Sequence, residues 1–157
     1  MIAPGNASGQ LDRAVLVVLT DALQRFGPEA AVVESGPVPR TGLWVTRVAP
    51  RRDGAARLSV AGECPQDAQG PDVALNITIS NSWLEVAGLS QPFVWLRALA
   101  DAVFAGRVVE RGFPSARAVE IETACGTVIG GAVQLPLLGR LFPQRRFLPY
   151  DAERHGA

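Results

Sequence analysis

The stretch Asp72–Gly112 reads DVALNITISNSWLEVAGLSQPFVWLRALADAVFAGRVVERG and carries the clearest structural pattern in the chain. From Val73 to Ile79, apolar residues alternate with polar or small ones. A period of two predicts a strand with one buried face and one wet face, which is typical of an antiparallel sheet. The rest of the fold is predicted outward from this strand.

A tight turn is predicted at Asn81–Ser82, because asparagine tolerates positive φ. The chain then returns through residues 83–86 as a second strand. This register places Ile79 opposite Leu84, so that the apolar side chains share one face. It leaves Trp83 on the polar face of the hairpin.

A helix is predicted after this hairpin, beginning at Ser90, whose hydroxyl can cap free backbone amides. Apolar residues, among them Leu99, recur at helical spacing, and the pattern ends near Gly112. Arg97 and Asp101 are spaced as an i,i+4 ion pair. We expect this helix to lie across the hairpin.

A second amphipathic helix is predicted near the N-terminus, where apolar residues recur at steps of three and four from Leu11 to Phe26. Gly27–Pro28 ends it. Asp21 and Arg25 are expected to pair on its wet side. Core packing is its expected role, because the pattern is too short for a coiled-coil seam.

A second hairpin is predicted from residues 43–49 and 57–62, around the turn signal Asp53–Gly54. With a loop of even length, Leu58 shares a face with Val45, and Trp44 points the other way. A loop of odd length with a bulge reverses this relation for one strand. The sequence leaves both pairings open.

Further strands are predicted at Ala118–Cys125 and Thr127–Ile129. Together these elements predict an α+β fold, an antiparallel sheet of about five to seven strands with two helices packed on one face. One domain is expected to span residues 1–157, with residues 151–157 as a frayed tail.

Composition limits the classes of function. The chain has 15 basic and 15 acidic residues, so its overall charge favours neither nucleic acid nor a membrane as partner. Every basic residue is arginine, and the absence of lysine excludes a Schiff-base lysine and a phosphate-loop lysine. No apolar run approaches the roughly 18 residues of a membrane span, and no signal peptide is recognised, which predicts a cytoplasmic location.

The residues that usually carry catalysis are scarce. The one histidine, His155, lies in the expected tail, and Cys64 and Cys125 lack the spacing of a zinc site. Glu120 and Glu122 share one face of a predicted strand, as paired acid–base carboxylates would, although a solvated face is the more common meaning of this pattern. No catalytic residue, metal or cofactor is therefore predicted. A small enzyme using these carboxylates or the Cys125 thiol in a cleft is the alternative.

Two segments are locally basic. The first holds Arg40, Arg47, Arg51, Arg52 and Arg57, and the second holds Arg140, Arg145, Arg146 and Arg154 beside Phe142, Phe147 and Tyr150. Arginine interleaved with aromatic residues is typical of single-stranded nucleic-acid binding and also of protein interfaces. Because the overall charge is neutral, nucleic acid is not expected as the main partner.

The sequence favours a non-enzymatic protein-binding module of the immunity, adaptor or chaperone type, by analogy of size and class alone. A tryptophan on an otherwise polar sheet face can anchor a protein partner or a second copy of the chain. The predicted partner-binding residues are Trp83, Trp44, Arg47, Arg51, Arg52 and Arg57. The alternative for the tryptophan face is that residues 135–150 fold over it and cover it. Nucleic-acid binding through the arginine hairpin and the basic–aromatic segment is the third hypothesis.

Overall fold

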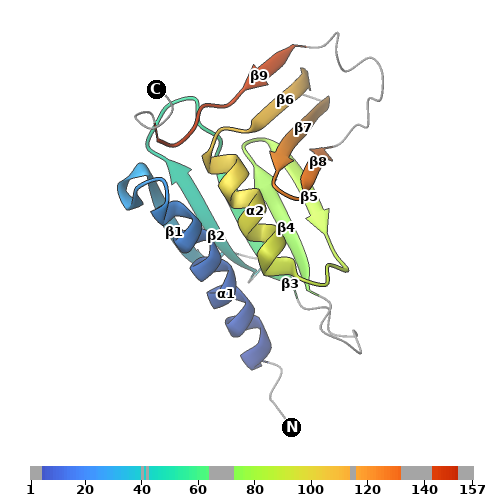
Figure 1. The fold of residues 1–157 in the computed structure, drawn as a ribbon. Helices are drawn as coiled ribbons and strands as arrows, with labels where there is room; N and C mark the ends of the chain where they lie inside the picture. Colours follow the sequence, from blue (N-terminus) through green and yellow to red (C-terminus); the bar gives the residue numbers. More distant parts are fainter. Residues whose placement is uncertain are drawn as a thin grey trace.

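The computed structural model describes residues 5–39, 41, 43–63, 73–113, 116–131 and 143–151. Cys64, Phe142, His155 and the tail after Asp151 lie outside the described residues. The elements of Figure 1 are α1 (Gly5–Gln24), a short 3-10 turn (Pro28–Ala30), β1 (Ala31–Pro37), β2 (Trp44–Pro50), β3 (Leu58–Glu63), β4 (Ala74–Ile79), β5 (Ser82–Val86), α2 (Pro92–Phe104), β6 (Val108–Phe113), β7 (Ala116–Thr123), β8 (Gly126–Gly131) and β9 (Gln144–Arg146). None of the described helices is long and apolar enough to cross a membrane.

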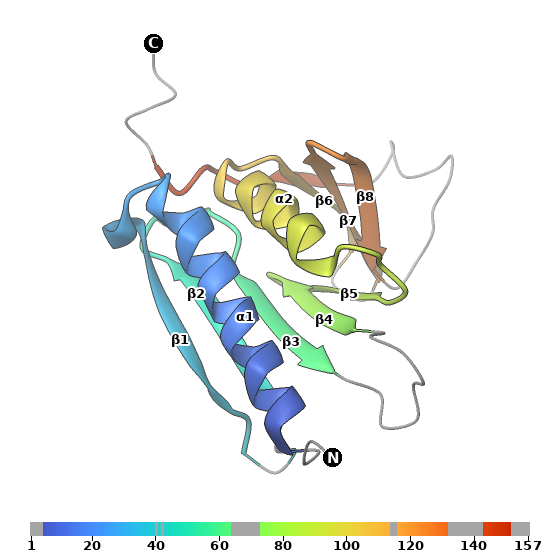
Figure 2. The same ribbon diagram turned by 60° about the horizontal axis from the view of Figure 1, so that its bottom comes forward.

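The first five strands form one antiparallel sheet in the order β1-β2-β3-β4-β5. Both helices lie on the same side of this sheet, as Figure 2 shows. On that side β4 presents Leu75, Ile77 and Ile79, which are buried. The predicted α+β class, the antiparallel pairing and the position of both helices on one face are confirmed.

The predicted faces of the β4–β5 hairpin are confirmed, but its turn is wrong by one position. Ile79 pairs with Ser82 and Ile77 with Leu84, so the turn is Ser80–Asn81. Ser80 has a φ of 53°, a left-handed conformation that the sequence assigned to Asn81. Because the register differs from the prediction by an even number of residues, each side chain keeps its face.

The β2–β3 hairpin adopts the second of the two pairings that the sequence left open. Val48 pairs with Leu58 and Thr46 with Val60, and all four side chains are buried on the helix-covered side. Trp44 has the same parity as Thr46 along β2, so it lies on this side as well.

The predicted end of the second helix is wrong. α2 stops at Phe104, and Gly106 adopts a left-handed φ of 72° two residues later. Residues Val108–Phe113 then form β6, which the sequence assigned to the helix and its end. The helix N-cap is Gln91 rather than Ser90, without a side-chain hydrogen bond. Pairing with neighbouring strands outweighs the helical spacing of this short apolar segment.

The remaining strands form a second antiparallel sheet in the order β8-β7-β6-β9. The prediction of about five to seven strands is therefore approximate, because the described strands divide into sheets of five and four. The second sheet packs on the helix side of the first: a Cβ added to Gly130 of β8 would lie 2.9 Å from the Cβ of Leu84 in β5. One hydrophobic core includes residues of both helices and both sheets.

The two helices are linked by ion pairs. Arg25, the residue after the end of α1, lies 2.9 Å from Asp101 of α2, and Asp21 of α1 lies 3.9 Å from Arg97 of α2. The sequence assigned these four residues to pairs within each helix. In the structure the pairs instead link the two helices. They form because α1 and α2 pack side by side.

Residues 147–150 are anchored in the core through aromatic rings. Phe104 of α2 meets Phe26 edge-on, with ring centroids 5.9 Å apart, and packs at 4.6 Å against Tyr150. Phe147 and Tyr150 are each only 4% exposed. Neither ring is therefore available as a surface for stacking bases. These described residues also do not cover Trp83, which is 55% exposed.

Because the Tyr150 phenol is buried, we expect the protein to lose stability at alkaline pH. The Tyr150 hydroxyl donates to the Ala56 carbonyl at 2.6 Å, and burial raises the pKa of the phenol above its usual 10.0. Above about pH 10 the unfolded chain releases this proton while the folded chain keeps it, so the free energy of unfolding falls by up to about 1.4 kcal/mol per pH unit. Urea unfolding across this range measures the effect.

Two features of the sequence make this measurement clean. Tyr150 is the only tyrosine, so tyrosinate absorbance reports this residue alone. The chain also has no lysine that would titrate in the same range. Tyr150→Phe is the control and should lose this contribution to the alkaline slope. A folded protein whose tyrosinate forms with an ordinary pKa would contradict the buried phenol.

Candidate functional site

One side of the five-stranded sheet faces away from both helices, and we call it the open face. Its central row crosses all five strands as Glu34, Arg47, Ser59, Thr78 and Trp83, each paired with the next. Facing side chains of neighbouring strands lie close together. Two predicted binding residues, Arg47 on β2 and Trp83 on β5, therefore lie in one row on the same face of the sheet.

The neighbouring row of the open face runs Val45, Ala61, Asn76 and Glu85. Its central side chains are small or short, like those of Ser59 and Thr78 in the first row. The described packing of the helices and of the second sheet lies on the other side of this layer. Trp83 is 55% exposed and is therefore the largest aromatic group presented on this face.

Trp44 does not join Trp83. It lies on the helix-covered side at the far end of β2, where its indole nitrogen donates to the Ser35 hydroxyl at 2.7 Å. There it lines a cavity of about 280 Å³ with residues of α1, among them Asp12 and Leu16. Burial raises the pKa of the Asp12 carboxyl. The structure thus assigns the two tryptophans to separate surfaces.

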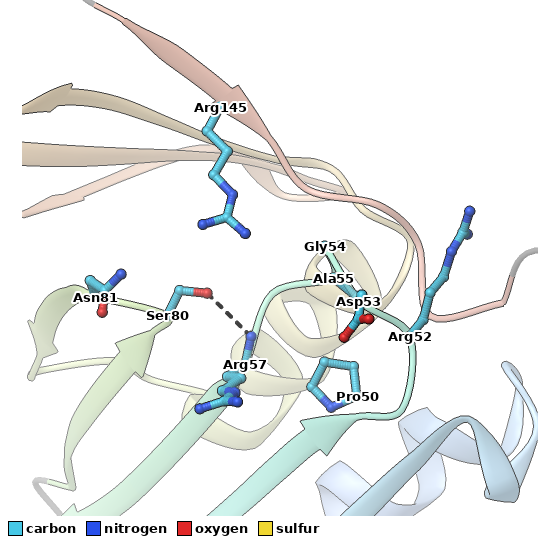
Figure 3. Close-up of a pocket in the computed structure, with 9 residues that line it drawn as sticks. All are labelled: Pro50, Arg52, Asp53, Gly54, Ala55, Arg57, Ser80, Asn81 and Arg145. Carbon is cyan, nitrogen blue, oxygen red and sulfur yellow. Dashed lines mark hydrogen bonds between the residues drawn. The ribbon is translucent and has the colours of Figure 1, made fainter.

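The arginines of the β2–β3 connection lie at a third place, the end of the five-stranded sheet. Arg52 and Arg57 line a cavity of about 270 Å³ there. Arg145 of β9 reaches toward the same cavity from the second sheet, and Figure 3 shows it above Ser80 and Asn81. Residues of the two basic segments therefore line the same cavity. The sequence could not predict this, because the segments lie far apart along the chain.

The walls of this cavity are tied together by backbone hydrogen bonds. The Ser80 amide donates to the Arg57 carbonyl at 2.9 Å, and the Arg57 amide donates to the Ser80 hydroxyl oxygen at 3.3 Å. On the other side, the Leu148 amide donates to the Gly54 carbonyl at 3.0 Å. The turn, the loop and the C-terminal segment are therefore held in one arrangement.

The acidic strand β7 lies apart from the two described cavities. Glu120 lies 3.5 Å from the Arg111 guanidinium, and its neighbour Glu122 is exposed. Cys125 is exposed in the turn between β7 and β8. Neither described cavity is lined by any of these three candidate residues. Among the described residues, no cluster of His, Cys, Asp and Glu suits a metal ion.

The sequence reasoning missed two contributors to the arginine-lined cavity. Ser80 was expected within a strand and Asn81 in the turn, and neither was assigned a binding role. The signal that could have identified them is the turn itself, since turn residues at a sheet end are often exposed for binding. Comparison of the chain with protein-family models, with curated proteins and with solved structures gave no match.

Proposed function

We propose that the chain is a non-enzymatic protein-binding module, of the immunity, adaptor or chaperone type, whose partner packs on the open face of the five-stranded sheet. The observation that carries the proposal is Trp83, which is 55% exposed at the end of a row whose central side chains, Ser59 and Thr78, are short and polar. Tryptophan buries a large area when a partner covers it and is enriched among residues that dominate binding energy.

The shape of the open face supports a flat protein partner. Ser59, Ala61 and Thr78 occupy its middle, and short side chains there allow a sheet or helix to approach closely. The two described cavities lie elsewhere, one at the end of the sheet and one against α1. A broad contact with Trp83 at its border is the arrangement that these side chains favour.

The charges of the open face support a partner with charges of both signs. Glu34 and Arg47 face each other across β1 and β2, and Glu85 lies beside Trp83 on β5. Such a mixed surface does not attract a polyanion, and it sets the orientation of a protein partner more than its affinity. A second copy of the chain satisfies the same requirement, because a mixed surface complements itself about a two-fold axis.

Trp83→Ala tests this proposal. The variant should retain the melting temperature of the parent, because the side chain is exposed, and should bind the partner at least tenfold more weakly, as expected for a loss of about 2 kcal/mol at an anchor residue. The measurement is capture from an extract of the native host on the immobilised chain, followed by affinity determination for the recovered partner. Sedimentation of the purified chain measures self-association in parallel.

Trp44→Ala is the matched control, because it removes the same side chain from the opposite side of the sheet. It should leave partner capture unchanged. If Trp83→Ala lowers self-association and Trp44→Ala does not, the partner is a second copy. Equal capture by the parent and by Trp83→Ala would exclude the open face as the binding surface.

A further inference from the structure

The cavity at the end of the five-stranded sheet is positively charged. Its charged lining consists of Arg52, Arg57 and Arg145 against one acid, Asp53. Its remaining lining residues include Ser80 and Asn81, which carry hydrogen-bonding side chains. Its volume of about 270 Å³ suits a small ligand. Unlike the open face, it is formed by residues of both sheets.

These arginines are not neutralised within the described part of the chain. None of the four ion pairs found there includes Arg52, Arg57 or Arg145. Arg52 donates to the Pro149 carbonyl at 3.1 Å and so holds the C-terminal segment. Arg145 lies 4.7 Å above the ring of Phe147, a contact that orients the guanidinium without using its N–H donors.

The arrangement of the turn supplies a further donor. The Ser80 hydroxyl oxygen accepts the Arg57 amide, so its own proton remains available for a ligand. Figure 3 shows Arg145 directed toward Ser80 and Asn81, while Arg52 points to the other side of the loop and the Arg57 side chain points away from Arg145. Ser80 has a φ of 53°, an uncommon conformation for serine, and such conformations recur at binding sites.

We propose that this cavity binds a small oxyanion, a phosphate or a dicarboxylate, with Arg145 as the cationic residue that faces Ser80 and Asn81, these two as neutral donors, and Arg57 as a second cation at the rim. Guanidinium groups match the geometry of carboxylate and phosphate oxygens. A single carboxylate, Asp53, does not suit a cation. A nucleic-acid strand is not favoured, because Phe147 and Tyr150 are buried and unavailable for stacking on bases.

The test is isothermal titration calorimetry of the full chain with inorganic phosphate, and separately with succinate, at constant ionic strength set with chloride. We expect saturable binding with a stoichiometry of one. Arg145→Gln should weaken it about tenfold or more, as expected for removing charge-assisted hydrogen bonds. Whichever anion binds more tightly identifies its class, phosphate or dicarboxylate.

Arg146→Gln is the matched control. Arg146 is the next residue on β9, is exposed and does not line the cavity. The substitution changes the net charge by the same amount as Arg145→Gln, but outside the cavity. It should leave the affinity within about twofold, a difference of about 0.4 kcal/mol. Arg57→Gln provides a second test at a residue outside β9, should Arg145→Gln alter the melting temperature.

Two results would overturn the proposal. One is the absence of saturable binding of both anions up to about 50 mM, which corresponds to an affinity too weak for a built site. The other is equal weakening by Arg145→Gln and Arg146→Gln, because a diffuse basic surface would produce this result. Neither result affects the proposed use of the open face, which is tested by Trp83→Ala.

Discussion

Leu99→Asp is expected to unfold the protein. Leu99 lies in α2, is completely buried, and belongs to the core shared by the helices and the two sheets. The substitution removes a leucine, which alone costs about 2–5 kcal/mol, and places a carboxylate in the apolar core. The sum is comparable to the whole stability of a typical domain, about 5–15 kcal/mol. Far-UV circular dichroism and urea denaturation measure the loss.

Val94→Asp is the control for this prediction. Val94 lies on the same helix but is 59% exposed, so its replacement introduces the same carboxylate without burying it. We expect a change within about 0.5 kcal/mol. If Leu99→Asp kept the urea midpoint of the parent, α2 would not pack on the sheets as described.

Gly106→Ala should produce the second largest effect. Gly106 has a left-handed φ of 72°, and a Cβ there would lie 2.6 Å from the Pro149 nitrogen and 2.8 Å from the Leu148 carbonyl carbon. Both are backbone atoms, so the C-terminal segment has to move away from α2. The conformational cost is about 1–2 kcal/mol, and displacing Tyr150 from the Phe104 ring adds to it. We expect a total loss of about 3 kcal/mol or more, measured by chemical denaturation.

Gly88→Ala separates these two contributions. Gly88 has nearly the same φ, 70°, but a Cβ added there meets no atom within 4 Å. Its cost should be the conformational term alone, about 1–2 kcal/mol. Equal destabilisation by the two variants would show that the close approach of residues 147–149 to Gly106 contributes nothing.

These variants also distinguish the two binding proposals. Gly106→Ala acts on the segment that carries Arg145 and should therefore weaken oxyanion binding even where the protein remains folded. Trp83 lies on β5, away from this segment, so partner capture on the open face should persist in the folded fraction. Such a split would show that the cavity and the open face are separate sites.

Periodicity along the chain predicted the elements that depend on local pattern. The alternation in β4 identified a half-buried strand, and the three–four spacing in α1 identified a helix with one apolar side, because each pattern reflects which side chains meet water. The same reasoning placed Trp83 on the polar side of its hairpin. It failed for residues 108–113, since a short apolar segment suits a helix or a buried strand equally well.

What the sequence determined by itself was the α+β class, the two amphipathic helices and the buried face of the β4–β5 hairpin, because these follow from spacing between near neighbours. Tertiary structure alone decided that the strands form two sheets, that Trp44 and Trp83 lie on opposite sides, and that Arg57 and Arg145 line one cavity. The physical reason is that pairing between distant strands depends on loop length, register and the closing of a shared core. Loop length, register and core closure cannot be read from the local spacing of apolar and polar residues.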